Sequence, residues 1–272
     1  MKKPVLISAV FITILGFIAW SVVHTPVELE TKPIILGHGG MGVRSLIPLD
    51  SKASIEKAIA YPIQGTELDV KITADFVLVA FHDEELQTST SCSGNVASSL
   101  YSEIENCEYK SLLYTERIAT VQSILEMGHA DSTLFSFDLK LDPQMEGDFL
   151  AGFVTQVIKI VNEFPQYRFV IESQSIETLK SLKYWNANAE LYFYGHRPNS
   201  AIQLASANEL SGISIDVKQI TSDDISLAKK TGLKVMLWGC GDVFSNRKTL
   251  KLNADIIQTD DIASMVRLLE LD

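Results

Sequence analysis

The sequence has no excess of positive charge, no internal repeats and no low-complexity tracts, and these absences narrow what the protein can be. Its 23 Lys and Arg residues against 34 Asp and Glu residues give a formal net charge of −11. We expect no nucleic-acid partner because nothing resembles a basic stripe, and general attraction to anionic lipid head groups is disfavoured. With 46% hydrophobic and 21% charged residues, the 272-residue chain has the composition of an ordinary globular protein with one large domain.

Cysteine is also scarce, with three residues in the whole chain: Cys92, Cys107 and Cys240. Outside the cytoplasm the first two are candidates for a disulfide across a short loop, and the alternative is two unpaired small side chains. Such a disulfide would rigidify the Ser-, Thr- and Asn-rich segment that follows His82. Cys240 closes an apolar strand and is expected to be a buried thiol.

The N-terminal segment differs from the rest because it is long and uncharged. Lys2 and Lys3 precede an unbroken run from Pro4 to Val23. At helical rise such a run spans about 30 Å, the thickness of a bilayer core, and lysines on the short side favour a cytoplasmic N-terminus. We expect residues 1–25 to be a membrane anchor that leaves the remainder in the periplasm or extracellular space. The alternative is a cleaved signal peptide and a secreted or periplasmic protein.

Residues 26–32 are expected to be a linker, and from residue 33 onward short apolar runs alternate with helical patterns. Several runs are rich in β-branched residues, which is typical of strands buried on both faces. This alternation predicts an α/β fold, a (β/α)8 TIM barrel over residues 33–272, with a doubly wound open sheet as the alternative. The expected strands are residues 34–38, 66–73, 77–83, 134–140, 168–173, 190–194, 212–217, 234–238 and 255–259. The expected helices are residues 51–61, 149–164, 175–185, 222–231 and 260–271.

One connection is too short for a strict barrel. Only about three residues separate the second and third expected strands, whereas a parallel crossover needs a dozen or more. We therefore expect an antiparallel hairpin here. With the turn centred on residues 74–75, Glu67 would lie opposite His82 and Asp69 opposite Ala80, so that the histidine comes beside both carboxylates.

Two histidines follow strand-like runs near the front of the chain, and they suit proton transfer. His38 ends the first run and His82 the third. An imidazole has a pKa near neutrality that its neighbours can move. Phosphodiester cleavage needs one group to accept a proton from the attacking oxygen and another to donate one to the leaving oxygen.

Two carboxylates on the second run suit a metal ion. Glu67 and Asp69 are separated by one residue, so their side chains share a face of the strand. Buried there, they would repel each other unless a cation or another partner lay between them. We interpret them as ligands of Ca²⁺ or Mg²⁺, hard ions that prefer oxygen donors. The alternative is a salt bridge to Lys71 or Lys140.

Three motifs occur in order: His-Gly-Gly at residues 38–40, Glu-Leu-Asp-Val at residues 67–70, and Thr-x-Asp-x-x-Leu-Val-x-x-His-Asp at residues 73–83. Their order and spacing resemble the glycerophosphodiester phosphodiesterase family, whose TIM barrel is related to that of phosphatidylinositol-specific phospholipase C. The resemblance implies metal-dependent hydrolysis of glycerophosphodiesters to glycerol 3-phosphate and an alcohol. It also implies that His38 and His82 are the general acid/base pair.

Later segments carry further implied roles. Asp138 stands where the family has the Glu of a Glu-x-Lys motif, which implies a third metal carboxylate, one methylene shorter. Lys140 is then expected to contact a phosphoryl oxygen. Trp238 resembles the family's strand-end Trp and is expected to pack on the alcohol part of the substrate, with core packing as the alternative. Glu172 ends a strand and is a candidate to contact groups of the site.

The chain also departs from the family pattern. Gly39 stands where the family usually has a phosphate-binding Arg, so either backbone N–H groups of the glycine-rich loop bind the anion or Arg44 reaches back to it. The family's Pro-Glu-Asn-Thr segment is Pro-Leu-Asp-Ser at residues 48–51. Asp50 could join the metal site, but we expect it to cap the helix that begins at Ser51.

Two other functions are compatible with these motifs. The first is a phospholipase-D-like or lyase-type enzyme that acts on lipid or sugar phosphodiesters, which suits an anchored barrel beside a bilayer. The second is a degenerate barrel that binds a phosphorylated ligand without turnover, which the departures from the family pattern suggest. The sequence predicts no particular oligomeric state.

Overall fold

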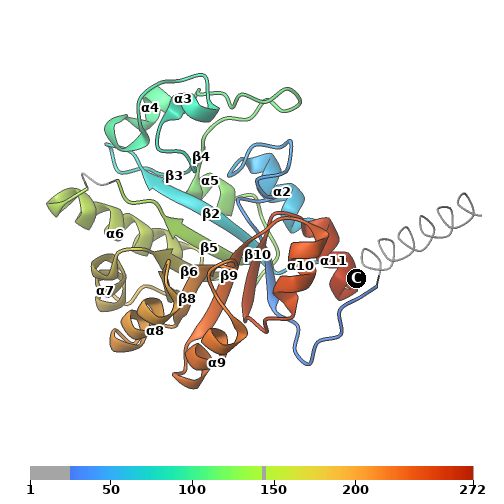
Figure 1. Cartoon of the computed structure of the whole chain (residues 1–272). Coiled ribbons are helices and arrows are strands. Elements are labelled where there is room, and N and C mark those ends of the chain that lie inside the picture. The colour runs from blue at the N-terminus through green and yellow to red at the C-terminus, as the bar shows by residue number, and fades with distance from the viewer. Residues whose placement is uncertain (1–24, 143–144, 272) are drawn as a thin grey trace, which may run out of the picture.

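Figure 1 shows a computed structural model of the chain, which describes residues 25–142 and 145–271. β1 (Ile34–Gly37) pairs in parallel with both β2 (Gly65–Ile72) and β10 (Ile256–Thr259), and this double pairing closes the sheet into a barrel. Eight parallel strands form the closed ring, so the TIM-barrel prediction is confirmed and the open sheet is wrong. Between β2 and β10 the ring contains β5 (Leu134–Leu139), β6 (Arg168–Ser173), β7 (Glu190–Tyr194), β8 (Gly212–Asp216) and β9 (Lys234–Cys240).

Helices surround the barrel (Figure 1). They are α2 (Lys52–Ile59), α5 (Val121–Leu125), α6 (Gly147–Glu163), α7 (Ile176–Tyr184), α8 (Pro198–Ala207), α9 (Ser222–Lys230), α10 (Val243–Leu250) and α11 (Ile262–Leu269). The longest, α6, buries Phe153, Val154, Val157 and Val161, an apolar stripe at helical spacing. Among these helices, the five expected from the sequence are present, and α5, α8 and α10 are additional.

The expected hairpin is present, but its register differs from the prediction by one residue. β3 (Leu78–Ala80) runs antiparallel to β2, with Val70 opposite Ala80. The turn contains three residues, because Phe76 adopts a left-handed conformation with φ of 64° and lets Thr73 pair with Val77. The predicted opposition of Asp69 to Ala80, and of Glu67 to His82, is therefore wrong.

A lobe of residues 84–118 follows the hairpin and packs on it. It contains α3 (Leu86–Ser89), the 3-10 helix η1 (Val96–Ser98) and α4 (Tyr101–Ile104), and it returns to the sheet through β4 (Ala119–Thr120). The lobe has a hydrophobic core of its own around Phe81. Cys92 and Cys107 form the expected disulfide, with a Cα–Cα distance of 5.5 Å. Cys240 is a buried free thiol, as expected, and burial raises its pKa to about 12.

Most of the predicted N-terminal anchor, including the entire uncharged run, lies outside the described residues. Within residues 25–142 and 145–271, no helix combines the length and apolarity needed to cross a bilayer. The predicted linker contacts the barrel through α11, because Val27 N donates to Leu268 O at 2.8 Å and Lys32 Nζ donates to Leu269 O at 2.7 Å.

Candidate active site

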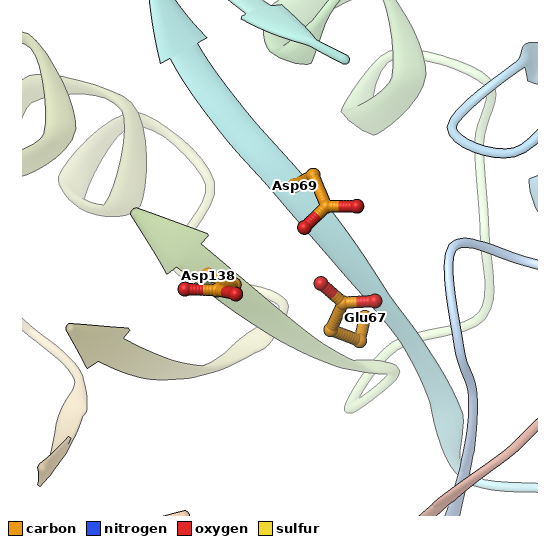
Figure 2. A group of neighbouring side chains, drawn as sticks. All are labelled: Glu67, Asp69 and Asp138. Atoms are coloured by element: carbon orange, nitrogen blue, oxygen red, sulfur yellow. The ribbon is translucent and has the colours of Figure 1, made fainter. Parts of the chain in front are cut away.

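Three carboxylates converge at the C-terminal end of the barrel strands (Figure 2). Glu67 and Asp69 project from β2, and the parallel pairing of β2 with β5 places Asp138 beside Asp69. One oxygen of each carboxylate lies within 4.8 Å of the others. All three residues are at most 8% exposed. Strand alternation and register together create this cluster, and active sites of TIM barrels lie at this end.

The cluster holds more negative charge than its protein partners neutralise. Lys140 Nζ lies 2.9 Å from Asp69 Oδ1 and 2.5 Å from Asp138 Oδ2, so the salt bridge considered as an alternative is present for Asp69. Burial lowers the pKa of Lys140, but the two carboxylates outweigh burial and keep the pKa above its ordinary value. Burial, and then repulsion from Asp69, holds the pKa of Glu67 well above its ordinary value.

The other two carboxyl groups respond in opposite directions. Burial raises the pKa of Asp138 more than Lys140 lowers it. For Asp69, burial is again the largest effect, but the charges of Lys140, His82 and His38 outweigh it and lower the pKa. Asp69 Oδ2 is buried and has no hydrogen-bond partner among the described residues. Three buried carboxylates, one with an unpaired oxygen, fit a hard divalent cation.

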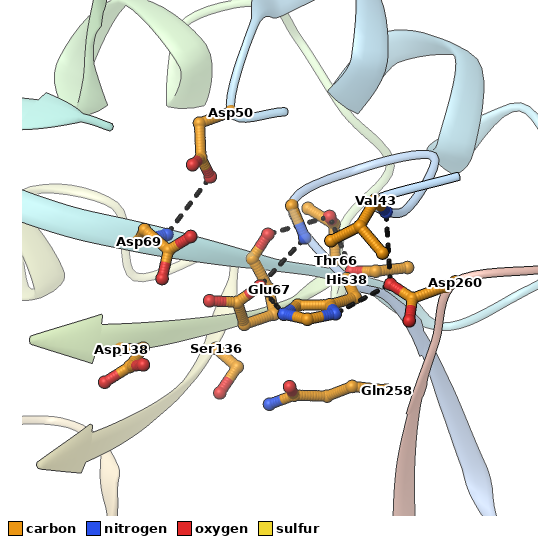
Figure 3. Close-up of polar contacts among 12 residues, drawn as sticks. His38, Val43, Asp50, Thr66, Glu67, Asp69, Ser136, Asp138, Gln258 and Asp260 are labelled. Atoms are coloured by element: carbon orange, nitrogen blue, oxygen red, sulfur yellow. Dashed lines mark hydrogen bonds and ion pairs between the residues drawn. The ribbon is translucent and has the colours of Figure 1, made fainter. Parts of the chain in front are cut away.

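Asp50 adds a further carboxyl group beside the cluster, a position that the sequence analysis gave only as the alternative to helix capping. Its Oδ1 accepts a hydrogen bond from Asp69 N at 3.1 Å (Figure 3), and it is fully buried. The expectation that Asp50 caps α2 is wrong, because Ser51 is the N-cap and accepts from Ser54 N. Burial, and then the charges of Asp69 and Glu67, raise the pKa of Asp50 well above its ordinary value.

Glu172 lies on β6 directly beside Asp138. Its Oε1 accepts hydrogen bonds from Ser136 Oγ at 3.0 Å and from Gln258 Nε2 at 2.6 Å. Burial, and then the charge of Asp138, raise the pKa of Glu172 to about 7. Glu172 therefore lies next to the three-carboxylate cluster, close enough to Asp138 for the two carboxyl groups to interact electrostatically.

His38 is fixed in orientation by the last barrel strand (Figure 3). Its Nδ1 lies 2.8 Å from Asp260 Oδ1, and its Nε2 lies 4.0 Å from Glu67 Oε2. Burial lowers the pKa of His38, but the hydrogen bond and charge of Asp260 outweigh burial and raise it above the ordinary value. The sequence analysis missed this role of Asp260. The predicted closed barrel could have indicated this role, because the pairing of β1 with β10 brings the residues after both strands together.

His82 follows β3 and lies at a solvent-exposed edge of the same region. Its side chain is 52% exposed, and its Nδ1 lies 3.1 Å from Asp83 Oδ1. A cavity of about 800 Å³ is lined by His82 together with Asp138 and Lys140. Since the charges of both His38 and His82 lower the pKa of Asp69, the two imidazoles share one electrostatic environment around that carboxylate.

The glycine-rich loop after β1 is tightly built into the protein. Gly39 N donates to Glu67 Oε2 at 2.8 Å, Gly40 N to Thr66 Oγ1 at 3.1 Å, and Met41 N to Ser54 Oγ at 2.9 Å. A Cβ on Gly40 would lie 2.4 Å from Ser54 Oγ at a φ of 89°, so this position requires glycine. These three N–H groups already have acceptors within the protein, which leaves them unable to bind an anion in this arrangement.

Arg44 and Trp238, both predicted to bind substrate, contact other parts of the barrel mouth. Arg44 Nη1 donates to Gly241 O at 2.6 Å and lies 3.5 Å from Asp242 Oδ2, so the guanidinium points to the loop after β9. Trp238 stacks on Tyr194, with ring centroids 5.5 Å apart and planes 9° apart. Its Nε1 is buried without a partner in the described part of the chain. The substrate-binding roles of both residues stay predictions.

Comparison with known proteins agrees with this architecture. The sequence model of the Glycerophosphoryl diester phosphodiesterase family matches residues 42–264. A glycerophosphodiester phosphodiesterase of Caldanaerobacter subterraneus subsp. tengcongensis is 23% identical over 244 residues, which cover 87% of this chain and 98% of that protein.

Solved structures show the same fold. A phosphodiesterase of Oleispira antarctica, in complex with the product sn-glycerol-3-phosphate, has a TM-score of 0.77 at 18% identity and covers 88% of this chain and 97% of its own. A glycerophosphodiester phosphodiesterase of Agrobacterium tumefaciens has a TM-score of 0.68 at 22% identity and covers 86% of this chain and 98% of its own.

The fold and the site thus define a TIM-barrel phosphoric diester hydrolase. The chain belongs to the glycerophosphoryl diester phosphodiesterase family, as the resemblance predicted.

Proposed function

We propose that this protein hydrolyses glycerophosphodiesters to glycerol 3-phosphate and an alcohol, using a divalent cation and the imidazoles of His38 and His82. The observation that carries the proposal is the arrangement of Figure 3, in which a histidine oriented by Asp260 faces a buried acidic cluster. Glu67, Asp69 and Asp138 would hold Ca²⁺ or Mg²⁺. When bound, such a cation polarises the phosphoryl oxygens and stabilises their charge.

The side chains around the cation site have separate roles in the proposed reaction. Because Asp260 binds Nδ1 of His38, proton exchange is left to Nε2, which faces the acidic cluster. His82 is the second imidazole, at the exposed edge of the cavity, where it exchanges a proton with the other oxygen of the reaction. The Lys140 ammonium, kept charged by its carboxylate partners, is positioned to attract a phosphoryl oxygen.

A panel of glycerophosphodiesters tests this proposal. The full-length chain with Ca²⁺ or Mg²⁺ should release glycerol 3-phosphate, and His38→Ala and His82→Ala should each lower kcat by about 100-fold or more. His129→Ala is the matched control, since His129 hydrogen-bonds Ile124 O before β5, at the other end of the barrel strands. Absence of hydrolysis for every substrate, or full activity in both variants, would refute the mechanism. A cyclic phosphate product would instead favour the lyase-type reaction.

We also propose that residues 1–25 anchor the protein in a membrane, with the barrel in the periplasm or outside the cell. The Cys92–Cys107 disulfide supports an oxidising compartment for the barrel. Cell fractionation tests both parts. Protein of full mass in the membrane fraction, accessible to protease from outside the cytoplasm, is expected. A shorter protein in the soluble periplasmic or secreted fraction would instead support a cleaved signal peptide.

A further inference from the structure

A second cavity, of about 550 Å³, opens beside the candidate active site between the loop after β1 and the lobe of residues 84–118. Its lining is largely apolar and includes Ile47, Leu49, Phe81 and Leu113. Ile47 and Phe81 are buried and form part of the wall. Cavities of this size and character are typical of sites for small organic ligands.

Exposed apolar side chains gather at the rim of this cavity. Leu46 is 73% exposed, Leu112 is 102% exposed, Leu113 is 68% exposed and Val43 is 55% exposed, and all four line the cavity. They come from two separate segments, residues 42–49 and 109–113, that converge here. Scattered single apolar residues on a surface need no explanation, but a group around a cavity marks a binding site.

The apolar cavity adjoins the cavity of about 800 Å³ that Asp138 and Lys140 line, which we call the polar cavity. His82 and Asp83 line both of them. A phosphoryl group placed between His82 and the acidic cluster therefore has an apolar cavity within reach of one of its two ester substituents. A small polar alcohol such as choline or glycerol would leave that apolar surface exposed to water, whereas a hydrocarbon chain would cover it.

We propose that the apolar cavity binds a single hydrocarbon chain, so that the favoured substrates are phosphodiesters that carry one acyl or alkyl chain, the chemistry of lysophospholipids. This inference rests on the proposed function and specifies its substrate class. The chain lies against Leu46 and Leu113, past His82, while the phosphodiester occupies the polar cavity. Burial of each methylene contributes about the same free energy, so chain length should control the specificity constant.

A chain-length series tests the proposal on the full-length protein. The substrates are sn-glycero-3-phosphocholine and 1-acyl-lysophosphatidylcholines from hexanoyl to dodecanoyl, all below the concentrations at which they aggregate. We expect kcat/KM to rise by about fourfold per added methylene until the cavity is filled. Equal kcat/KM for all chain lengths, alongside hydrolysis of glycerophosphocholine, would overturn the chain proposal and leave the proposed function intact.

Substitutions at the rim locate the effect. Leu46→Asp and Leu113→Asp change exposed side chains, and each should lower kcat/KM for the dodecanoyl substrate by about tenfold while glycerophosphocholine hydrolysis is unchanged. Leu204→Asp on α8 makes the same replacement at a residue that is 41% exposed and does not line the cavity, and it should have no effect. If chain length accelerated hydrolysis only above the aggregation concentration, the rim would be a lipid-surface contact and the proposal would be overturned.

A binding measurement separates this inference from catalysis. Dodecylphosphocholine is a phosphodiester with one alkyl chain, and calorimetry can measure its binding as a monomer to His38→Ala. We expect binding that weakens about tenfold when Leu46→Asp is added. Absence of binding would overturn the chain proposal, whether or not the activity assays detect any product. A silent activity panel together with such binding would refute the proposed hydrolysis while retaining the apolar site.

Discussion

Divalent cations should stabilise this protein through the cluster of Glu67, Asp69 and Asp138. The three groups lie within 4.8 Å of one another and are at most 8% exposed, and their mutual repulsion is only partly relieved by Lys140. A cation at 100 times its dissociation constant stabilises the folded state by about 2.7 kcal/mol. For a chain of this size that corresponds to a rise in Tm of roughly 5–10 °C.

The size of this shift should depend on pH, and the pKa directions fix its sign. The pKa of Glu67 is well above its ordinary value in the folded, cation-free protein, so between the ordinary and the raised pKa the folded state binds more protons than the unfolded state. The contribution of this group to stability is therefore lost as pH rises through that window. A cation replaces the proton, so the rise in Tm should be larger at about pH 8 than at about pH 5.5.

Thermal unfolding followed by circular dichroism, in Ca²⁺, in Mg²⁺ and in EDTA, measures the effect. Glu67→Gln and Asp69→Asn should each lose most of the cation-dependent shift. Asp223→Asn, an exposed carboxylate in the first turn of α9, is the matched control and should keep it. A wild-type Tm that is the same in cation and in EDTA, or an equal shift in all variants, would refute the reasoning.

Three further predictions concern groups around the cluster. Asp260→Asn removes the charge that raises the pKa of His38, so the limb of the kcat–pH profile that reports His38 should move to lower pH. We also expect kcat to fall about 100-fold. An unchanged profile would contradict the role of Asp260 in setting the pKa of His38. Asp50→Asn keeps an acceptor for Asp69 N but removes a repelling carboxyl group. In EDTA near neutral pH, the free energy of unfolding in urea should therefore rise by about 1 kcal/mol or more. A decrease in the free energy of unfolding would contradict this prediction. Cys107→Ser opens a disulfide loop with a sequence separation of 15 and should lower the free energy of unfolding by roughly 3 kcal/mol under non-reducing conditions, a loss that wild type should reproduce when reduced.

The strands of the barrel could be predicted from the sequence because burial on both faces gives them continuous apolar runs. β6 and β7 have the expected bounds, and β8 ends one residue earlier than expected. Part of the acidic cluster could also be predicted from the sequence, since alternation along β2 places two of its members on one face. Asp138 followed from the family resemblance, and the register of β2 with β5 explains why it meets the other two.

Other features depend on contacts that no local pattern encodes. α10 buries Asn246 and Thr249 beside Leu250, and Asn246 Nδ2 donates to Asp261 O at 3.0 Å, so its inward face is partly polar and shows no apolar stripe. The hairpin register depends on the left-handed conformation of Phe76, which a residue of that type rarely adopts.

Asp50 and Asp260 show the same limit within the site. Asp50 has the residue type of a helix cap and lies directly before Ser51, the N-cap of α2, yet its side chain turns inward to Asp69 N. Asp260 is 222 residues from His38 in the chain, and only barrel closure brings the two together. Local sequence thus indicated the chemistry of the site, while long-range strand pairing determined which groups position it.

The most direct test of the central claim is the anomalous diffraction of a crystal soaked with Mn²⁺ and glycerol 3-phosphate. Mn²⁺ takes the oxygen ligands that suit Mg²⁺ and Ca²⁺. We predict one anomalous peak bound by Glu67, Asp69 and Asp138, with the phosphate within reach of His38 Nε2. A peak elsewhere, or a phosphate bound away from these carboxylates, would contradict the account.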